Sequence, residues 1–146
     1  MKKLVGFAFL VLMLVAAQCS DGNAAPKISV EDAWVRPSAM KAGSGAVYVT
    51  LKNTGGGDVL VSAASDVAEA VELHQTKMDG DMMKMSPVPN IPVPAGETVK
   101  LEPGGKHIML INLKQPLKPG ETISVTLNFE KSGAMTLDVP VKPNGE

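Results

Sequence analysis

The chain has 146 residues, of which 45% are hydrophobic and 20% are charged, and its formal net charge at pH 7 is −1. Nucleic-acid binding is excluded, because it needs a basic surface with interleaved aromatics, whereas this chain has one arginine and only 3% aromatic residues. The one cysteine, Cys19, lies near the N-terminus. The rest of the chain therefore has no disulfide, no Cys-x-x-Cys redox pair, no zinc–thiolate site and no cysteine nucleophile.

Residues 1–19 have the form of a secretory signal peptide. Lys2 and Lys3 provide the positive start, and residues 4–17 form an uncharged apolar stretch. This stretch is shorter than the roughly 20 apolar residues that span a bilayer. We therefore expect an exported protein, located in the periplasm or on the outer face of the cytoplasmic membrane.

Two processing routes remain open at the end of this leader. Val15-Ala16-Ala17 fits cleavage after small residues, whereas Ala16-Ala17-Gln18-Cys19 resembles a lipoprotein box, in which Gln18 replaces the usual small residue. In the second route Cys19 carries a lipid that tethers the domain to a membrane surface through a flexible segment at residues 20–26.

From residue 27 onward the sequence predicts an all-β domain. Short runs with alternating or β-branched residues are separated by clusters of Gly, Pro and Asn, and no helical stretch competes. The domain should cover residues 27–142, followed by a short tail at 143–146. The expected strands are 28–35, 46–53, 59–64, 68–74, 82–88, 98–102, 106–113, 122–130 and 135–141. This spacing is typical of an antiparallel Greek-key sandwich or barrel, which we expect to be a single, monomeric domain.

Two aromatic residues and one loop methionine need separate interpretation. Trp34 and Tyr48 lie in expected strands among apolar neighbours, so the sequence predicts that they anchor the core. Met40 lies in an expected loop at residues 37–45. For Met40, packing over apolar surface and approach to a binding site remain open alternatives.

The strongest functional pattern is H-x10-M-x21-H-x-M, formed by His74, Met85, His107 and Met109. Methionine is a common core filler and a single histidine is usually structural, so each residue alone is uninformative. Both histidines of the chain, however, belong to this one pattern. In an extended strand, His107 and Met109 project from the same face. Imidazole with thioether sulfur suits Cu(I), so the pattern predicts one Cu(I) per chain.

Zinc is the main alternative metal. It would be held by His74 and His107 together with Glu72, Asp79 or Asp81. The spacing of the methionines argues against zinc, and the lack of a thiol in the domain excludes a blue-copper electron-transfer centre.

The segment at residues 72–85 is expected to form a β-hairpin, because Asp79-Gly80 is a strong turn dipeptide. Pairing about this turn brings His74 close to Met85 across the two strands.

Three further methionines lie in the same hairpin. We expect Met78 to lie opposite Asp81 or Met82, near the tip, where it could act as an outer or transient ligand. Met82 and Met83 are expected to pack against apolar surface rather than bind metal.

The four-residue spacing resembles the signature of the PCu(A)C family of bacterial periplasmic copper chaperones. The resemblance extends to Ala33-Trp34-Val35-Arg36-Pro37, to Glu72-Leu73-His74 and to Leu101-Glu102-Pro103-Gly104-Gly105-Lys106-His107. It implies a cupredoxin-like fold that binds one Cu(I) through His74, Met85, His107 and Met109. It also implies delivery to the binuclear site of cytochrome c oxidase subunit II, alongside Sco-type thioredoxin-like proteins.

Three functions follow from these observations. The first is a metallochaperone that passes Cu(I) on by ligand exchange, without catalysis, since neither a thiol pair nor a Ser-His-Asp arrangement is suggested. The second is copper sequestration without a dedicated receiver. The third is a β-sandwich interaction domain in which the His and Met residues are incidental.

Overall fold

The protein was analysed as a computed structural model that describes residues 24–38 and 43–143. The leader at residues 1–19 with Cys19, most of the segment at 20–26, Met40, and residues 144–146 lie outside the described residues. The expectations for these parts therefore remain predictions.

The described residues form ten strands. Their bounds are β1 Ile28–Val35, β2 Ser44–Asn53, β3 Asp58–Ala64, β4 Ala68–Asp79, β5 Met82–Pro87, β6 Ile91–Val93, β7 Thr98–Leu101, β8 Lys106–Leu113, β9 Thr122–Phe129 and β10 Gly133–Pro140. All nine expected strands are present, and β4 continues beyond His74 to the end of the hairpin. The strand that the sequence analysis missed is β6, which has only three residues and contains Pro92.

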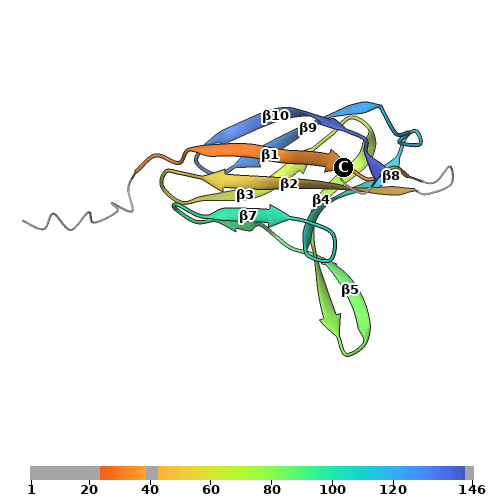
Figure 1. The fold of residues 1–146 in the computed structure, drawn as a ribbon, viewed down its shortest axis with the longest axis horizontal. Helices are drawn as coiled ribbons and strands as arrows, with labels where there is room; N and C mark the ends of the chain where they lie inside the picture. The colour runs from red at the N-terminus through yellow and green to blue at the C-terminus, as the bar shows by residue number, and fades with distance from the viewer. Residues whose placement is uncertain (1–23, 39–42, 144–146) are drawn as a thin grey trace, which may run out of the picture.

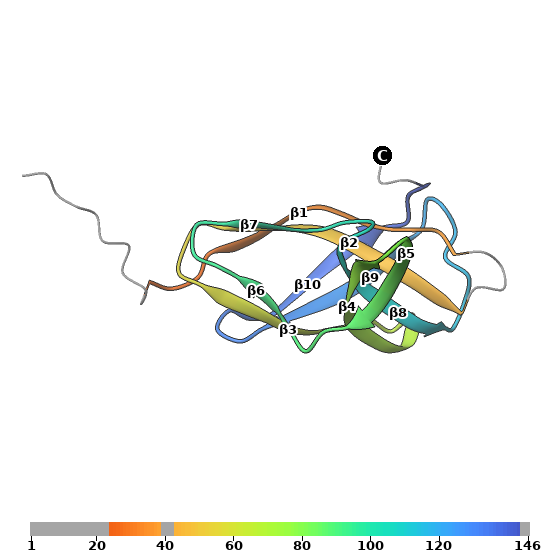
Figure 2. The ribbon, with the colours of Figure 1, turned by 90° about the horizontal axis from the view of Figure 1, so that it is seen from below.

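The strands form two sheets that pack face to face (Figures 1 and 2). One sheet has the order β1-β2-β8-β4-β5, with β7 also paired to β2, and the other has the order β10-β9-β3-β6. Neighbouring strands pair antiparallel throughout both sheets. The expected all-β sandwich is thus confirmed. Within the described residues, no helix is long and apolar enough to cross a membrane.

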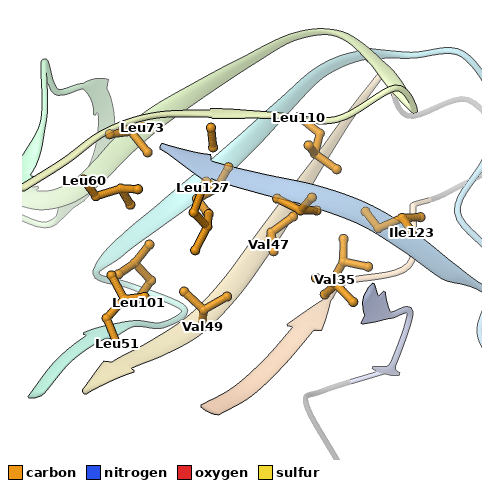
Figure 3. Packing of buried hydrophobic residues seen from close by; sticks show 14 of the residues in the cluster. Val35, Val47, Val49, Leu51, Leu60, Leu73, Leu101, Leu110, Ile123 and Leu127 are labelled. Carbon is orange, nitrogen blue, oxygen red and sulfur yellow. The ribbon is translucent and has the colours of Figure 1, made fainter. Parts of the chain in front are cut away.

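The core lies between the two sheets and follows from strict alternation along the strands. In β2, for example, Val47, Val49 and Leu51 point inward and are at most 1% exposed. Leu60 of β3 and Leu127 of β9 meet them from the other sheet, as the close-up of the core shows (Figure 3). Burial of these branched side chains is the main stabilising contribution to the sandwich.

A bulge in β1 changes which residues of that strand face inward. The register against β2 shifts between Glu31 and Trp34, and Asp32 has a positive φ of 49°. Val35 consequently enters the core, while Trp34 pairs with Tyr48 on the outer face of the sheet. Tyr48 is buried as expected, at 5% exposed, but neither aromatic belongs to the cluster between the sheets. The prediction of core anchoring is therefore confirmed for the burial of Tyr48 and wrong for Trp34, which is only partly buried.

The β4–β5 hairpin projects beyond the body of the sandwich. Figure 1 shows the end of β4 and all of β5 extending away from the two layers. β5 is an edge strand that pairs only with β4 in its sheet. The hairpin is therefore anchored at its base, where β4 also pairs with β8, and its tip is exposed.

The alternation in β3 can be tested with two adjacent residues, because Leu60 is fully buried and Val61 is 41% exposed. We expect Leu60→Ala to lower the free energy of unfolding by about 2 to 5 kcal/mol, through lost burial and a residual cavity. Val61→Ala should change it by less than about 1 kcal/mol. Urea denaturation of both variants measures the difference, and equal losses would contradict the inward orientation of Leu60.

Candidate metal centre

The two histidines lie directly opposite each other on neighbouring strands. In the β4–β8 ladder His74 pairs with His107, and the ring centroids are 5.8 Å apart. The next pair, Leu73 with Ile108, points the other way and is buried in the core. Both imidazoles therefore lie on the outer face of the larger sheet, backed by the hydrophobic core.

The two methionines of the motif lie on the same face. Met109 is two residues beyond His107 and is paired with Glu72 on β4 and with Ala46 on β2. Met85 pairs with Thr76, which lies two residues beyond His74 toward the hairpin tip and so on the same face. Strands β4, β5 and β8 thus bring the four motif positions to one region of the sheet.

The register of the hairpin differs from the predicted one. The turn consists of Gly80 and Asp81 alone, with Gly80 at a φ of 64°, so that Asp79 pairs with Met82. Met78 consequently lies opposite Met83, rather than opposite Asp81 or Met82. His74 lies opposite Pro87, two residues from the expected neighbour Met85, and the partner of Met78 is one or two residues from those expected. His74 and Met85 still share a face, because the shift between them is two residues.

Met85, His107 and Met109 line a cavity of about 350 Å³ on this face. The rest of its wall comes from the residues after β1, from β2, from the hairpin and from the turn before β8, namely Arg36, Pro37, Ser44, Gly45, Ala46, Tyr48, Thr76, Met83, Pro103 and Gly104. His74 lies beside this cavity, next to His107, and its side chain is 13% exposed. Three of the motif residues therefore line an open cavity, and the fourth, His74, lies next to it.

A single backbone carbonyl orients His107. Its ring Nδ1–H donates to the carbonyl oxygen of Gly105 at 3.2 Å, and the same oxygen accepts the N–H of Thr76 at 2.9 Å. Because a carbonyl can only accept, the Nε2 of His107 carries the free lone pair. His107 is only 3% exposed, so this orientation is held by its surroundings.

The turn before β8 places that carbonyl. The N–H of Gly105 donates to the carbonyl of Glu102 at 3.0 Å, and Gly104 has a φ of 81°. A type II turn requires a positive φ at its third position, which Gly104 provides, and proline is common at its second position, which Pro103 occupies. The sequence Pro-Gly-Gly ahead of His107 is therefore part of the site.

His74 is held by a carboxylate. Its Nε2–H donates to Oε2 of Glu72 at 2.9 Å, which leaves the lone pair on Nδ1. This Nδ1 is buried and has no hydrogen-bond partner. A buried polar atom without a partner is costly, and a bound cation would satisfy it. One nitrogen fixed and the other free is the usual state of a metal-binding histidine.

Burial lowers the pKa of the His107 imidazole below its ordinary value of 6.5. The Gly105 hydrogen bond raises the pKa and the neighbouring His74 lowers it further, but burial is the largest cause. His107 is consequently neutral at pH 7, which is the form that binds metals.

An aromatic wall supports the site from the side of β1 and β2. The ring centroids of Trp34 and Tyr48 are 4.6 Å apart, and that of Tyr48 lies 6.3 Å from that of His107. The Arg36 guanidinium lies 5.7 Å from the Tyr48 ring centroid. Burial raises the pKa of Tyr48, so this residue is a neutral packing partner. Sequence reasoning missed this wall, although Tyr48 alternates with the inward-facing Val47 and Val49.

The remaining hairpin methionines are not packed into the core. Met82 is 74% exposed and Met83 is 62% exposed, so the prediction that they cover apolar surface is wrong. The zinc alternative also loses support. By alternation Asp79 faces away from His74, and the described residues contain no group of three or more His, Cys, Asp or Glu that could hold a metal ion.

Comparison with known proteins gives one family and several similar structures. The model of a family described as "Putative lipoprotein LpqE-like" matches residues 28–141. "Putative lipoprotein Lxx21020" of Leifsonia xyli subsp. xyli (strain CTCB07) is 38% identical over 141 residues, covering 95% of this chain and 84% of that protein.

Among solved structures, the solution structure of CuI-DR1885 from Deinococcus radiodurans is 34% identical with a TM-score of 0.66, and the match covers 88% of this chain and 87% of that one. The copper-bound PCuAC domain from PmoF2 is 25% identical with a TM-score of 0.70, covering 80% and 93%. These matches confirm the resemblance to the PCu(A)C family and the cupredoxin-like sandwich.

We expect NMR titration of the metal-free protein to show a His107 pKa below 6.5. As the pH falls through 6.5, the unfolded chain takes up a proton at His107 while the folded protein does so only at its lower pKa. Acid therefore lowers the free energy of unfolding across that window. A His107→Gln variant should lose this part of the pH dependence, and a pKa of 6.5 or higher would contradict the burial argument.

Proposed function

The chain belongs to the LpqE-like family, and from this membership and the geometry of the site we propose that it binds one Cu(I) through His74, Met85, His107 and Met109. The observation that carries the proposal is the pair of opposed imidazoles, each with one nitrogen fixed by the protein and the other free. Two thioethers on the same face complete a soft, four-donor set.

The donor set favours Cu(I) over other ions. Imidazole and thioether are neutral, and sulfur is a soft donor, whereas zinc is usually bound by thiolate, imidazole or carboxylate. Glu72, the nearest carboxylate, is engaged by His74 and acts as its orienting partner. The similarity to the CuI-DR1885 structure supports the same assignment.

The arrangement suits ligand exchange rather than catalysis. Met85 belongs to the exposed hairpin and is itself 58% exposed, so it can be displaced without disturbing the sandwich. His107 is buried and fixed from behind, so it is the ligand that leaves last. A receiver that brings thiolates would replace the neutral ligands one at a time, because thiolates bind Cu(I) more strongly than thioethers.

We propose that the protein is an exported metallochaperone and that its receiver is the binuclear copper site of cytochrome c oxidase subunit II, together with a Sco-type protein. The receiver is taken from the resemblance to the PCu(A)C family. A leader at residues 1–19 and the lipoprotein name of the Leifsonia xyli relative support export, with Cys19 as a candidate lipid attachment site.

An anaerobic Cu(I) titration against a chromogenic chelator tests the binding site. We expect one Cu(I) per chain, and we expect His107→Ala and Met109→Ala each to weaken binding by more than about tenfold. That is the smallest effect usually seen when even an orienting partner of a metal ligand is removed.

Met82→Leu is the matched control for that titration, because Met82 pairs with Asp79 on the reverse face of the hairpin. Its affinity should equal that of the unchanged protein. If neither the His107 nor the Met109 variant binds more weakly, the four-residue site is wrong, and failure to bind Cu(I) at all would favour a plain interaction domain.

A deletion strain tests delivery against sequestration. If the protein supplies the oxidase, the strain should lose cytochrome c oxidase activity and recover it when copper is added to the medium. Sensitivity to copper with normal oxidase activity would contradict delivery and support sequestration. Complementation with a His107→Ala variant, which should fail, links the phenotype to the metal site.

A further inference from the structure

Three methionines of the β4–β5 hairpin lie outside the proposed copper ligands and are strongly exposed. Met78 is 65% exposed, Met82 is 74% exposed and Met83 is 62% exposed. Large apolar side chains are seldom gathered on a projecting hairpin unless they contact something. Their sulfur atoms are also soft metal donors.

The register divides these methionines between the two faces of the hairpin. Met78 and Met83 form a directly opposed cross-strand pair, and on their face of the hairpin the next pair is Thr76 and Met85. Residues two apart in a strand share a face, so Met78, Met83 and Met85 lie on the face of the proposed site. Met82 pairs with Asp79 on the reverse face.

The opposed pair adjoins the proposed copper site. Met83 lines the same cavity as Met85, His107 and Met109. Directly opposed residues have Cβ atoms about 4.5 to 5.5 Å apart, which is within reach for two flexible methionine side chains to share one ion. Thioethers therefore follow one another from the hairpin tip to the two imidazoles.

The reverse face is chemically different. There Lys77 and Lys84 form the opposed pair that neighbours Met82. Two ammonium groups outweigh the one carboxylate on this face, that of Asp79, and a net positive charge disfavours a cation. The two faces of the hairpin therefore offer a surface of net positive charge and a neutral, sulfur-lined one. Entry of a soft cation should be confined to the face with Met78 and Met83.

We propose that Met78 and Met83 form an outer, weaker Cu(I) site that receives the ion and passes it to Met85. This inference rests on the proposed function of the four-ligand site. The step is an exchange of neutral ligands: a bond from Cu(I) to the Met85 sulfur forms, a bond to an outer thioether breaks, and the ion remains Cu(I). Two thioethers bind more weakly than two thioethers with two imidazoles, so transfer runs inward.

NMR of the full-length protein labelled with [methyl-¹³C]methionine, titrated anaerobically with Cu(I), tests the outer site. The first equivalent should shift the methyl signals of Met85 and Met109. Further Cu(I) should shift Met78 and Met83 together and leave Met82 unchanged. Single Met→Leu variants assign the signals and keep the apolar volume nearly constant.

Stopped-flow transfer of Cu(I) from a chromogenic chelator tests the path inward. In the M78L/M83L double variant the uptake rate should fall by about tenfold, the change expected for a barrier raised by about 1.4 kcal/mol. The affinity for the first equivalent should be unchanged, and M82L should match the unchanged protein in both rate and affinity.

The outcomes separate the two proposals. If Met85 and Met109 shift but Met78 and Met83 do not, the outer site is wrong and the proposed function stands. If Met85 and Met109 do not shift, the four-ligand site is wrong, and the outer site loses its role with it.

Two further results would contradict the outer site itself. Shifts of Met82 together with Met78 and Met83 would indicate unselective binding to exposed sulfur, and an unchanged rate in M78L/M83L would show that Cu(I) enters by another route. Either result overturns the proposal.

Discussion

The site depends on the pairing of β4 with β8, which sets His74 opposite His107. The carbonyl of Gly105 connects this pairing to the imidazole, because it accepts both the backbone N–H of Thr76 on β4 and the ring N–H of His107. The backbone of β4 and the orientation of the His107 ring therefore depend on the same carbonyl oxygen. A displacement of this turn would move the strand register and the His107 lone pair together, and the type II turn holds it in place.

The four motif residues differ in how firmly they are held. His107 is enclosed by Tyr48, by the turn and by the core beneath the sheet, whereas Met85 lies on an edge hairpin and is mostly exposed. In the proposed copper site, one rigid side and one exposed side would allow the ligands to be replaced in sequence while part of the coordination persists. The lowered pKa of His107 keeps the buried side neutral, so protons compete little with a metal at pH 7.

Much of the fold and part of the site could be predicted from residue type and spacing. Alternating apolar residues and Gly/Pro turns identified nine strands, and the motif spacing identified which histidines and methionines share a face. The missed strand β6 has three residues, one of them Pro92, and is too short for a periodic signal. The hairpin register differed from the expected pairings of Met78 by one or two residues, because a turn dipeptide marks a turn without determining which residues form its last pair.

The sequence by itself determined the histidines and methionines of the motif, the absence of thiols from the domain and the all-β class, since these follow from composition, spacing and local periodicity. Only the tertiary structure decided that Trp34 packs against Tyr48 on the outer face of the sheet, because a bulge at Asp32 inverts the alternation of β1, and that the Tyr48 ring lies beside His107. It also decided which nitrogen of each histidine is free and that Met83 joins the site's cavity while Met82 faces away. Such relations depend on cross-strand register and hydrogen-bond partners, which residues distant in sequence supply and no local pattern encodes.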